Sequence, residues 1–500
     1  MMRKKLTSIS NHVVFLSNPE IGNLVPTVQF AQRLLHHHPS FSATILLITV
    51  PQRPVVNTFI QSLPTIAPNI QLVHLPHVDT PTPDQIATFT LANISHHPHL
   101  DAPSTGSTSE LGYISLLIKK QMPNVRQIMT DLNSTKSGSK SGRVVALFVD
   151  MFCTPMIDVA DELGIPCYLF FASPATFLGF MLELPTLDPQ HIFESETKLK
   201  VGSFAKPLPC KVLPSTVLKR RDGYSWYLYH AQRYRETKGI IINTFQELEP
   251  YALDSISKMN GVPKIFPIGP IIDDNGPTKW HPEKANFQSL ISWLDNQPTS
   301  SVVFLCFGSM RSLNEAQVRE IAIGLERAGY RFLWSLREPP KTKLAISSDY
   351  VDLVEVLPNG FLNRTNGMGL VCGWVPQVKI LAHKAVGGFV SHCGWNSILE
   401  SLWHGVPITT WPIFAEQQMN AFEIVEELGL ATKIRLDYRE QSNLVTADEV
   451  VKGINDLMRE NNKVRENVKV MKEKSRMTLM QNGSSQQLLK ALVEELIASS

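Results

Sequence analysis

The sequence predicts an α/β protein with two doubly wound domains that face each other across a cleft. Two strand-loop-helix patterns support this, one beginning at residue 12 and the other at residue 301. Their strands are continuous runs of β-branched and apolar residues, as in parallel sheets covered by helices on both faces. The length agrees, because 500 residues at roughly 150 per domain suffice for two or three domains.

The first pattern opens with a strand over residues 12–16 (HVVFL), followed by a polar loop. Pro26 then stands at a position suited to the first turn of a helix. Residues 43–49 (ATILLIT) predict a second buried strand, and residues 144–149 predict another that ends at Asp150. A ligand of such a sheet is expected at the carboxyl ends of the strands.

The second pattern opens with a strand over residues 301–307 and turns through Gly308. Asn314 is suited to cap the next helix, with Gln317 three residues further on. Later strands are expected over 331–335 and around 370–373, 388–391 and 408–411. Pro263, Pro267 and Pro270 punctuate an extended segment between the two patterns. We therefore assign residues 1–262 to the first domain, 263–300 to the linker and entry to the second, and 301–483 to the second domain.

The composition excludes several classes of function. The 47 basic and 45 acidic residues almost balance, so no strong field attracts nucleic acid. The six cysteines show no Cys-x-x-Cys spacing, and the histidine clusters at 36–38 and 96–99 lack further ligands, so no metal site is predicted. No apolar run approaches 18 residues and no signal peptide is recognisable, which predicts a cytoplasmic protein without a membrane span.

The most informative stretch is residues 374–417, in which polar and aromatic residues recur at a specific spacing. It contains Trp374, Gln377, His392, the run GWNS at 394–397, Glu400, Pro407, Glu416 and Gln417. This block resembles the sugar-nucleotide signature of plant family 1 UDP-dependent glycosyltransferases. Residues 243–249, 293–295 and 307–310 also resemble that family, so the similarity covers nearly the whole chain.

The resemblance implies the GT-B fold, which consists of two facing Rossmann-like domains, with the C-terminal helix, residues 484–500, packing back on the first domain. It implies that residues 1–262 bind the acceptor and residues 301–483 bind the UDP-sugar. The expected reaction is inverting transfer of glucose from UDP-glucose to a small lipophilic plant metabolite, a phenolic, flavonoid or terpenoid. Neither a metal nor a cofactor is expected, and the protein is expected to be a monomer.

The residue types in the block suit this donor. Trp374 offers a flat ring for uracil, and the Glu400 carboxylate can accept hydrogen bonds from both ribose hydroxyls. Residues 394–397 precede a helix whose N–H groups favour diphosphate. Any one of these residues alone is more often an ordinary core or surface residue. The prediction of a donor site rests on their joint spacing. The predicted donor-binding residues are Ser309, Trp374, Val375, Gln377, His392, Gly394, Trp395, Asn396, Ser397, Glu400, Glu416 and Gln417.

One departure from the family affects the chemistry. The family's first loop reads close to Pro-x-Pro-Gly-x-Gly-His, and that histidine removes the proton of the acceptor hydroxyl. This chain reads SNPEIGN over residues 17–23, so Asn23 replaces the histidine and Glu20 replaces a glycine. Asp150 matches the family's acidic partner of the histidine. Asn23 and Asp150 are the predicted catalytic positions, although an amide takes no proton near neutral pH.

Three interpretations of Asn23 remain open: a slow or specialised transferase, a binding protein without turnover, or a deliberate variant of an active enzyme. In an active enzyme, the proton could leave through Asp150 and a water molecule, through Glu20, or before binding if the acceptor is already ionised. For Glu20, the interpretation as an exposed loop carboxylate is favoured over a role as the base. The predicted acceptor pocket comprises Glu20, Met151, Phe152 and Phe180, of which the last three could equally be ordinary core residues.

Overall fold

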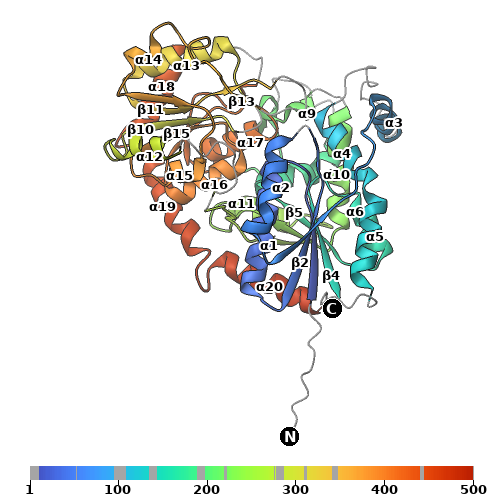
Figure 1. Ribbon diagram of the computed structural model, residues 1–500. Helices are drawn as coiled ribbons and strands as arrows, with labels where there is room; N and C mark the ends of the chain where they lie inside the picture. Colours follow the sequence, from blue (N-terminus) through green and yellow to red (C-terminus); the bar gives the residue numbers. More distant parts are fainter. Residues whose placement is uncertain are drawn as a thin grey trace.

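The computed structural model describes residues 11–51, 53–94, 109–134, 143–187, 198–218, 222–274, 276, 287–308, 312–340, 347–439 and 444–498. The chain forms two α/β domains that lie side by side (Figure 1). No helix in these ranges is long and apolar enough to cross a membrane.

The N-terminal domain is built on a parallel sheet, which in the described residues has seven strands in the order β3-β2-β1-β4-β5-β8-β9. The strands are β1 (Asn11–Leu16), β2 (Phe41–Leu47), β3 (Ile70–His74), β4 (Val144–Asp150), β5 (Cys167–Phe171), β8 (Gly239–Ile242) and β9 (Lys264–Pro267). Short strands β6 (Lys198–Leu199) and β7 (Leu208–Pro209) pair separately.

Helices cover both faces of this sheet, which explains the unbroken apolar runs of its strands. In β1, Val14 and Leu16 pack into one core cluster, whereas Val13 and Phe15 pack into the other. All four are fully buried. The longer helices are α1 (Ile21–His37), α2 (Pro54–Ile66), α3 (Pro83–Ile94), α4 (Glu110–Lys120), α5 (Met122–Asn133), α6 (Met156–Glu162), α7 (Ala175–Glu183), α10 (Asp222–Arg233) and α11 (Pro250–Ser257), with the short α9 (Ser215–Leu218).

Helix α1 begins five residues before the expected proline. Its first residue is Ile21, so Pro26 lies inside the helix instead of in its first turn. Proline has no N–H, and in a regular helix the N–H of residue 26 would bond to the carbonyl of Gly22. The Gly22 carbonyl therefore has no partner from position 26 and can accept a hydrogen bond from elsewhere.

The C-terminal domain has a second parallel sheet, six-stranded in the described residues, in the order β14-β11-β10-β15-β16-β17. The strands are β10 (Val302–Cys306), β11 (Arg331–Ser335), β14 (Gly369–Cys372), β15 (Val386–Ser391), β16 (Ile408–Thr410) and β17 (Ala431–Lys433), beside a hairpin of β12 (Arg337–Glu338) and β13 (Ser348–Asp349). The helices are α12 (Phe287–Asp295), α13 (Glu315–Ala328), α14 (Phe361–Arg364), α15 (Gln377–Leu381), α16 (Trp395–His404), α17 (Gln417–Phe422), α18 (Ala447–Met458), α19 (Lys463–Met477) and α20 (Ser484–Ala498). Asn314 caps α13 as expected, accepting a hydrogen bond from the Gln317 N–H.

The boundaries of the linker differ from those expected. Residues 264–267 were assigned to the linker, but they form β9, which pairs with β8 at the edge of the first sheet. Leu290 and Leu294 of α12 pack into the core of the C-terminal domain. The prolines misled the prediction because a strand at the edge of a sheet tolerates a missing N–H.

Two segments of the C-terminal half contact the N-terminal domain. Helix α20 returns across the molecule (Figure 1) and packs Leu489, Leu492 and Val493 into the core beneath the first sheet. Met419 and Phe422 of α17 belong to the other core cluster of the N-terminal domain. Helix α17 therefore stands between the domains and binds them together.

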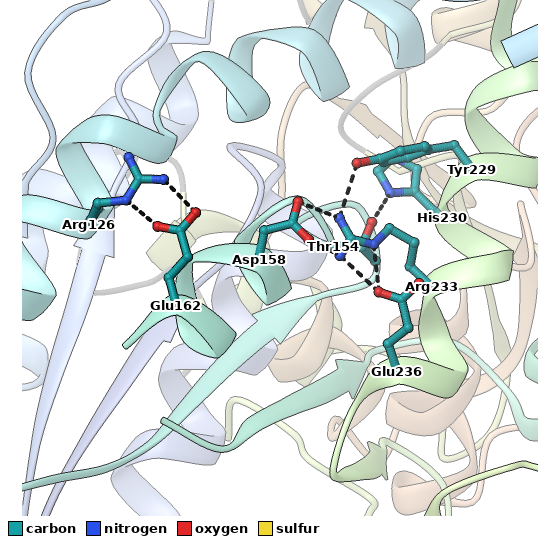
Figure 2. A network of polar contacts seen from close by, with 8 residues as sticks. All are labelled: Arg126, Thr154, Asp158, Glu162, Tyr229, His230, Arg233 and Glu236. Atoms are coloured by element: carbon teal, nitrogen blue, oxygen red, sulfur yellow. Dashed lines mark hydrogen bonds and ion pairs between the residues drawn. The ribbon is translucent and has the colours of Figure 1, made fainter. Parts of the chain in front are cut away.

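Polar contacts of Tyr229, His230 and Arg233 fix helix α10 within the N-terminal domain (Figure 2). Arg233, at its end, donates to Asp158 of α6 and to Glu236. Deeper inside, the His230 ring is fully buried, with Nδ1 2.7 Å from Thr154 Oγ1 and Nε2 3.0 Å from Ser115 Oγ. These contacts join α10 to α4 and α6.

His230 is expected to make the protein sensitive to acid. Burial, aided by Arg233, lowers the pKa of His230 to about 3, whereas an unfolded histidine titrates near 6.5. As pH falls below about 6.5, the unfolded chain gains a proton that the folded chain does not take, so the free energy of unfolding decreases. Between pH 7.5 and 5.5 the protein should lose about 1 kcal/mol more than the His230→Gln variant, measured by urea denaturation. Equal losses would show that His230 does not contribute.

Candidate active site

A cavity of about 940 Å³ opens between the domains, at the carboxyl ends of both sheets. The N-terminal domain contributes the loop after β1 and the residues after β4. The C-terminal domain contributes the ends of β10 and β11, the residues that follow β14 and the first turn of α16. Parallel α/β sheets bind ligands at this end because loops and helix N-termini converge there.

Gln377, Ser397 and Glu400 form a connected polar group at the C-terminal side of the cavity. The Gln377 Nε2 atom donates to Ser397 Oγ at 2.8 Å and to Glu400 Oε2 at 2.6 Å. Burial, with a smaller effect of Asp273, raises the pKa of Glu400 to about 7 against the opposing hydrogen bond from Gln377. A ligand that donates hydrogen bonds to this carboxylate would stabilise its charged form.

His392 lies between two glycines at the floor of the cavity. A Cβ atom at Gly308 would lie 2.8 Å from His392 Nε2, and one at Gly394 would lie 2.6 Å from it. Burial lowers the pKa of His392 to about 4, so the ring is neutral at pH 7. The Nδ1 atom has no hydrogen-bond partner within the described residues. The glycines therefore allow a neutral imidazole to stand beside the N-terminus of α16.

Two residues of α16 bond directly to the N-terminal domain. Trp395 Nε1 donates to the carbonyl of Asn243 at 2.7 Å. Asn396 Nδ2 donates at 2.8 Å to the carbonyl of Gly22, which Pro26 leaves without its usual helical partner. The N-termini of α1 and α16, neither of which has an acidic residue in its first turn, are thus linked across the cavity.

Glu416 and Gln417 lie at the start of α17. Gln417 Oε1 accepts from the N–H groups of Ile413 and Phe414, so its Nε2 atom remains as a donor. Burial raises the pKa of Glu416, and Ser173 of the N-terminal domain donates to it at 3.5 Å. Ala415, directly before them, has φ of 56°, a strained value for a residue with a side chain.

Asn23 and Asp150 are in direct contact. Asn23 Nδ2 donates to Asp150 Oδ2 at 2.7 Å, while Asn18 Nδ2 and the Phe152 N–H donate to Oδ1 at 2.8 and 2.9 Å. Burial raises the pKa of Asp150 to about 6 despite these bonds. Asp150 is only 1% exposed and does not line the cavity, whereas Asn23 does. The amide therefore stands between the carboxylate and any ligand.

Glu20 lines the cavity but is not the exposed loop carboxylate that was one expectation. Its Oε1 atom lies 2.7 Å from Nη2 of Arg53, whose side chain is fully buried. The same nitrogen also contacts Glu110 of α4. Glu20 is therefore held in a partly buried ion pair, and this pairing does not favour a role as a general base.

The N-terminal side of the cavity has apolar and aromatic walls. Of the residues predicted for the acceptor pocket, Met151 and Phe152 line the cavity, and so does Tyr227 of α10. The rings of Phe152 and Tyr227 lie 6.1 Å apart and nearly parallel, at 18°. Phe180 was wrongly predicted, because its side chain is fully buried in the core against Phe177 and does not reach the cavity.

Comparisons with known proteins identify the family. Residues 259–474 match the family model of UDP-glucuronosyl and UDP-glucosyl transferases. UDP-glycosyltransferase 43 of Pueraria montana var. lobata is 51% identical over 97% of this chain and 98% of its own. The chain is a UDP-dependent glycosyltransferase of plant family 1.

Further relatives agree. The UDP-glucose flavonoid 3-O-glucosyltransferase 6 of Fragaria ananassa is 42% identical over 98% of this chain and 99% of its own. The crystal structure of Medicago truncatula UGT71G1 complexed with UDP-glucose superimposes with a TM-score of 0.84 at 38% identity, covering 97% of this chain and 98% of that one. The glycosyltransferase therefore has the GT-B fold that the signature block implied.

The structure gathers nearly all of the predicted site residues of this glycosyltransferase around one cavity. Of the predicted donor residues, those that line it are Trp374, Val375, Gln377, His392, Gly394, Trp395, Asn396, Ser397, Glu400, Glu416 and Gln417. Ser309 lies outside the described residues. Sequence reasoning missed Asn18, Arg53, Asp222, Tyr227 and Arg439. Each has an ordinary local context, and only the Asn-Pro pair at Asn18 carried a local signal, that of a turn.

Proposed function

We propose that this glycosyltransferase inverts the anomeric carbon of UDP-glucose and transfers the glucose to a small, lipophilic, aromatic acceptor. The observation that carries the proposal is the single cavity that joins the donor signature of one domain to the aromatic wall of the other. Trp374 would stack on uracil, Glu400 would accept from the ribose hydroxyls, and the N-terminus of α16 would face the diphosphate. The flavonoid named for the Fragaria relative suits the flat space beside Phe152.

Asn23 would orient the acceptor rather than deprotonate it. Since its Nδ2 atom donates to Asp150, its amide oxygen is left to accept a hydrogen bond from the acceptor hydroxyl. Asp150 is shielded and Glu20 is ion-paired, so neither is placed to act as a direct base. Rate enhancement would then come from positioning and from the stabilised UDP leaving group. The proton of the acceptor hydroxyl would be lost to water, so acceptors whose hydroxyl ionises readily should react best.

UDP-glucose is expected to be used at least about tenfold better than UDP-galactose. The fixed Gln417 amide would offer its Nε2 atom to the sugar, and one misdirected hydrogen bond at a buried site costs about 1–3 kcal/mol. The measurement is UDP release with both donors in competition and a panel of phenolic acceptors. Equal use of the two donors would contradict glucose specificity, and UDP binding without release from any acceptor would indicate a binding protein.

A further inference from the structure

Asp222, which lines the acceptor side of the cavity, has a carboxylate oxygen without a hydrogen-bond partner in the described residues. It is the first residue of α10, is 2% exposed and lines the cavity. Its Oδ2 atom accepts from both the N–H and the hydroxyl of Ser109, each at 2.7 Å. Its Oδ1 atom is buried without a hydrogen-bond partner in the described residues. Such an oxygen is costly in a folded protein unless a ligand or water satisfies it.

The carboxylate is held in one position. A Cβ atom at Gly112 of α4 would come within 2.4 Å of Asp222 Oδ2, so glycine is needed for this approach. At Gly223, a Cβ atom would meet the Thr216 side chain at 2.6 Å. Ser109 is fixed in turn, because its hydroxyl oxygen caps α4 by accepting from the Gly112 N–H at 2.9 Å. Oδ1 is therefore preorganised.

Asp222 lines the cavity from the start of α10, whereas Asn23 lines it from α1. Glu20, three residues before Asn23, and Glu110 both line the cavity, and the buried Arg53 behind them pairs with both. Ser109, the residue before Glu110, donates a hydrogen bond to Asp222 through its N–H. Several side chains thus intervene between Asn23 and Asp222, and a group that meets Oδ1 would belong to the part of a bound acceptor remote from Asn23.

The surroundings indicate the chemistry of that group. The parallel rings of Phe152 and Tyr227 form the nearby wall and suit a flat aromatic molecule. The Arg439 guanidinium also lines the cavity, donating to Ser215 Oγ at 3.0 Å, and disfavours a second cation there. A carboxylate oxygen accepts hydrogen bonds only. A neutral O–H donor on an aromatic ring satisfies all three conditions.

We infer that Asp222 Oδ1 accepts a hydrogen bond from a second phenolic hydroxyl of the acceptor, remote from the hydroxyl that is glycosylated. The inference rests on the proposed function and narrows its acceptor class to aromatic compounds with hydroxyls at both ends. Asp222 is then a specificity-determining residue, which selects diphenols over their monomethyl ethers.

The inference is tested by acceptor binding, which does not depend on turnover. Calorimetry with UDP present would compare 4′,7-dihydroxyflavone with its 4′-methyl ether. The protein should bind the diphenol about tenfold or more tightly, as expected for a hydrogen bond to a charged group. In Asp222→Asn this ratio should fall to about one to two, while UDP affinity and the unfolding temperature confirm that the variant is folded.

Asp254→Asn is the matched control, because it removes the same charge from an exposed aspartate of α11 that pairs with Lys258. It should keep the full preference for the diphenol. If Asp222→Asn keeps the preference as well, or the protein shows none, the inference is overturned and Asp222 only joins α10 to α4. UDP release is measured separately. Selective binding without release would contradict the proposed function and leave the role of Asp222 supported.

Discussion

The Asn23→His variant is expected to turn over neutral hydroxyl acceptors about 10²-fold faster than the present protein, the lower end of what a positioned general base contributes. The amide Nδ2 of Asn23 already donates to Asp150 Oδ2 at 2.7 Å. An imidazole N–H could take over that contact, which would orient the ring and stabilise its protonated form. The measurement is kcat for UDP release with a simple phenol.

The same geometry requires a non-additive double-mutant cycle. Replacing Asp150 by asparagine should slow the Asn23→His enzyme far more than it slows the present enzyme, because only the histidine needs the carboxylate for its charge. Asn18 and the Phe152 N–H hold the other carboxylate oxygen and should keep Asp150 in place in both backgrounds. If Asn23→His leaves kcat unchanged while the present protein is already fast, the acceptor loses its proton without a protein base.

Acceptor acidity offers an independent check on the missing base. In the present protein, rates should rise steeply as the acceptor hydroxyl becomes more acidic, because a larger fraction is ionised before transfer. In Asn23→His the dependence should flatten, since the imidazole removes the proton of weaker acids as well. This comparison uses the same acceptor series for both proteins.

The strands could be predicted because their apolar runs are long and bounded by turns. Residues 12–16, 144–149 and 331–335 all fall within observed strands, with one or no residue of difference at their ends. The start of α1 was misplaced because Pro26 was read as a first-turn residue. Pro26 lies inside the helix and donates no hydrogen bond to the Gly22 carbonyl. That carbonyl accepts instead from Asn396 of the other domain. The sequence around Pro26 could not predict this hydrogen bond, because its donor lies in the other domain.

The two halves of the site differed in how well they could be predicted. The donor side is concentrated in residues 374–417, where spacing along a few consecutive elements fixes position in space. The acceptor side is assembled from α4, α10 and the residues after β1 and β4, which lie far apart in the chain. Asp222 and Tyr227 therefore gave no signal, and Phe180 could not be distinguished from a core residue by its type.

Replacing Glu400 by alanine is expected to weaken UDP-glucose binding by about 1–3 kcal/mol, or roughly 5- to 150-fold. The variant would leave the ribose hydroxyls and the Gln377 amide without the carboxylate that accepts from Gln377 at 2.6 Å. Calorimetry at pH 8 measures the effect with the carboxylate ionised. Unchanged affinity would remove Glu400 from the donor site.

Because the pKa of Glu400 is raised to about 7 in the free protein, UDP-glucose affinity should also depend on pH. Hydrogen bonds from the ribose favour the ionised carboxylate, so binding is strong above pH 7 and weakens as pH falls, by up to about tenfold per unit. His392 stays neutral through this range, since its pKa is about 4. UDP-glucose is a diphosphate diester, so its own charge is constant. The pKa of Asp150 is raised to about 6, so the comparison is made between pH 6.5 and 8, where the Glu400→Gln variant should bind with a much shallower pH dependence. An equally steep dependence in that variant would place the titrating group elsewhere, with Glu416, whose pKa is also raised, as the next candidate.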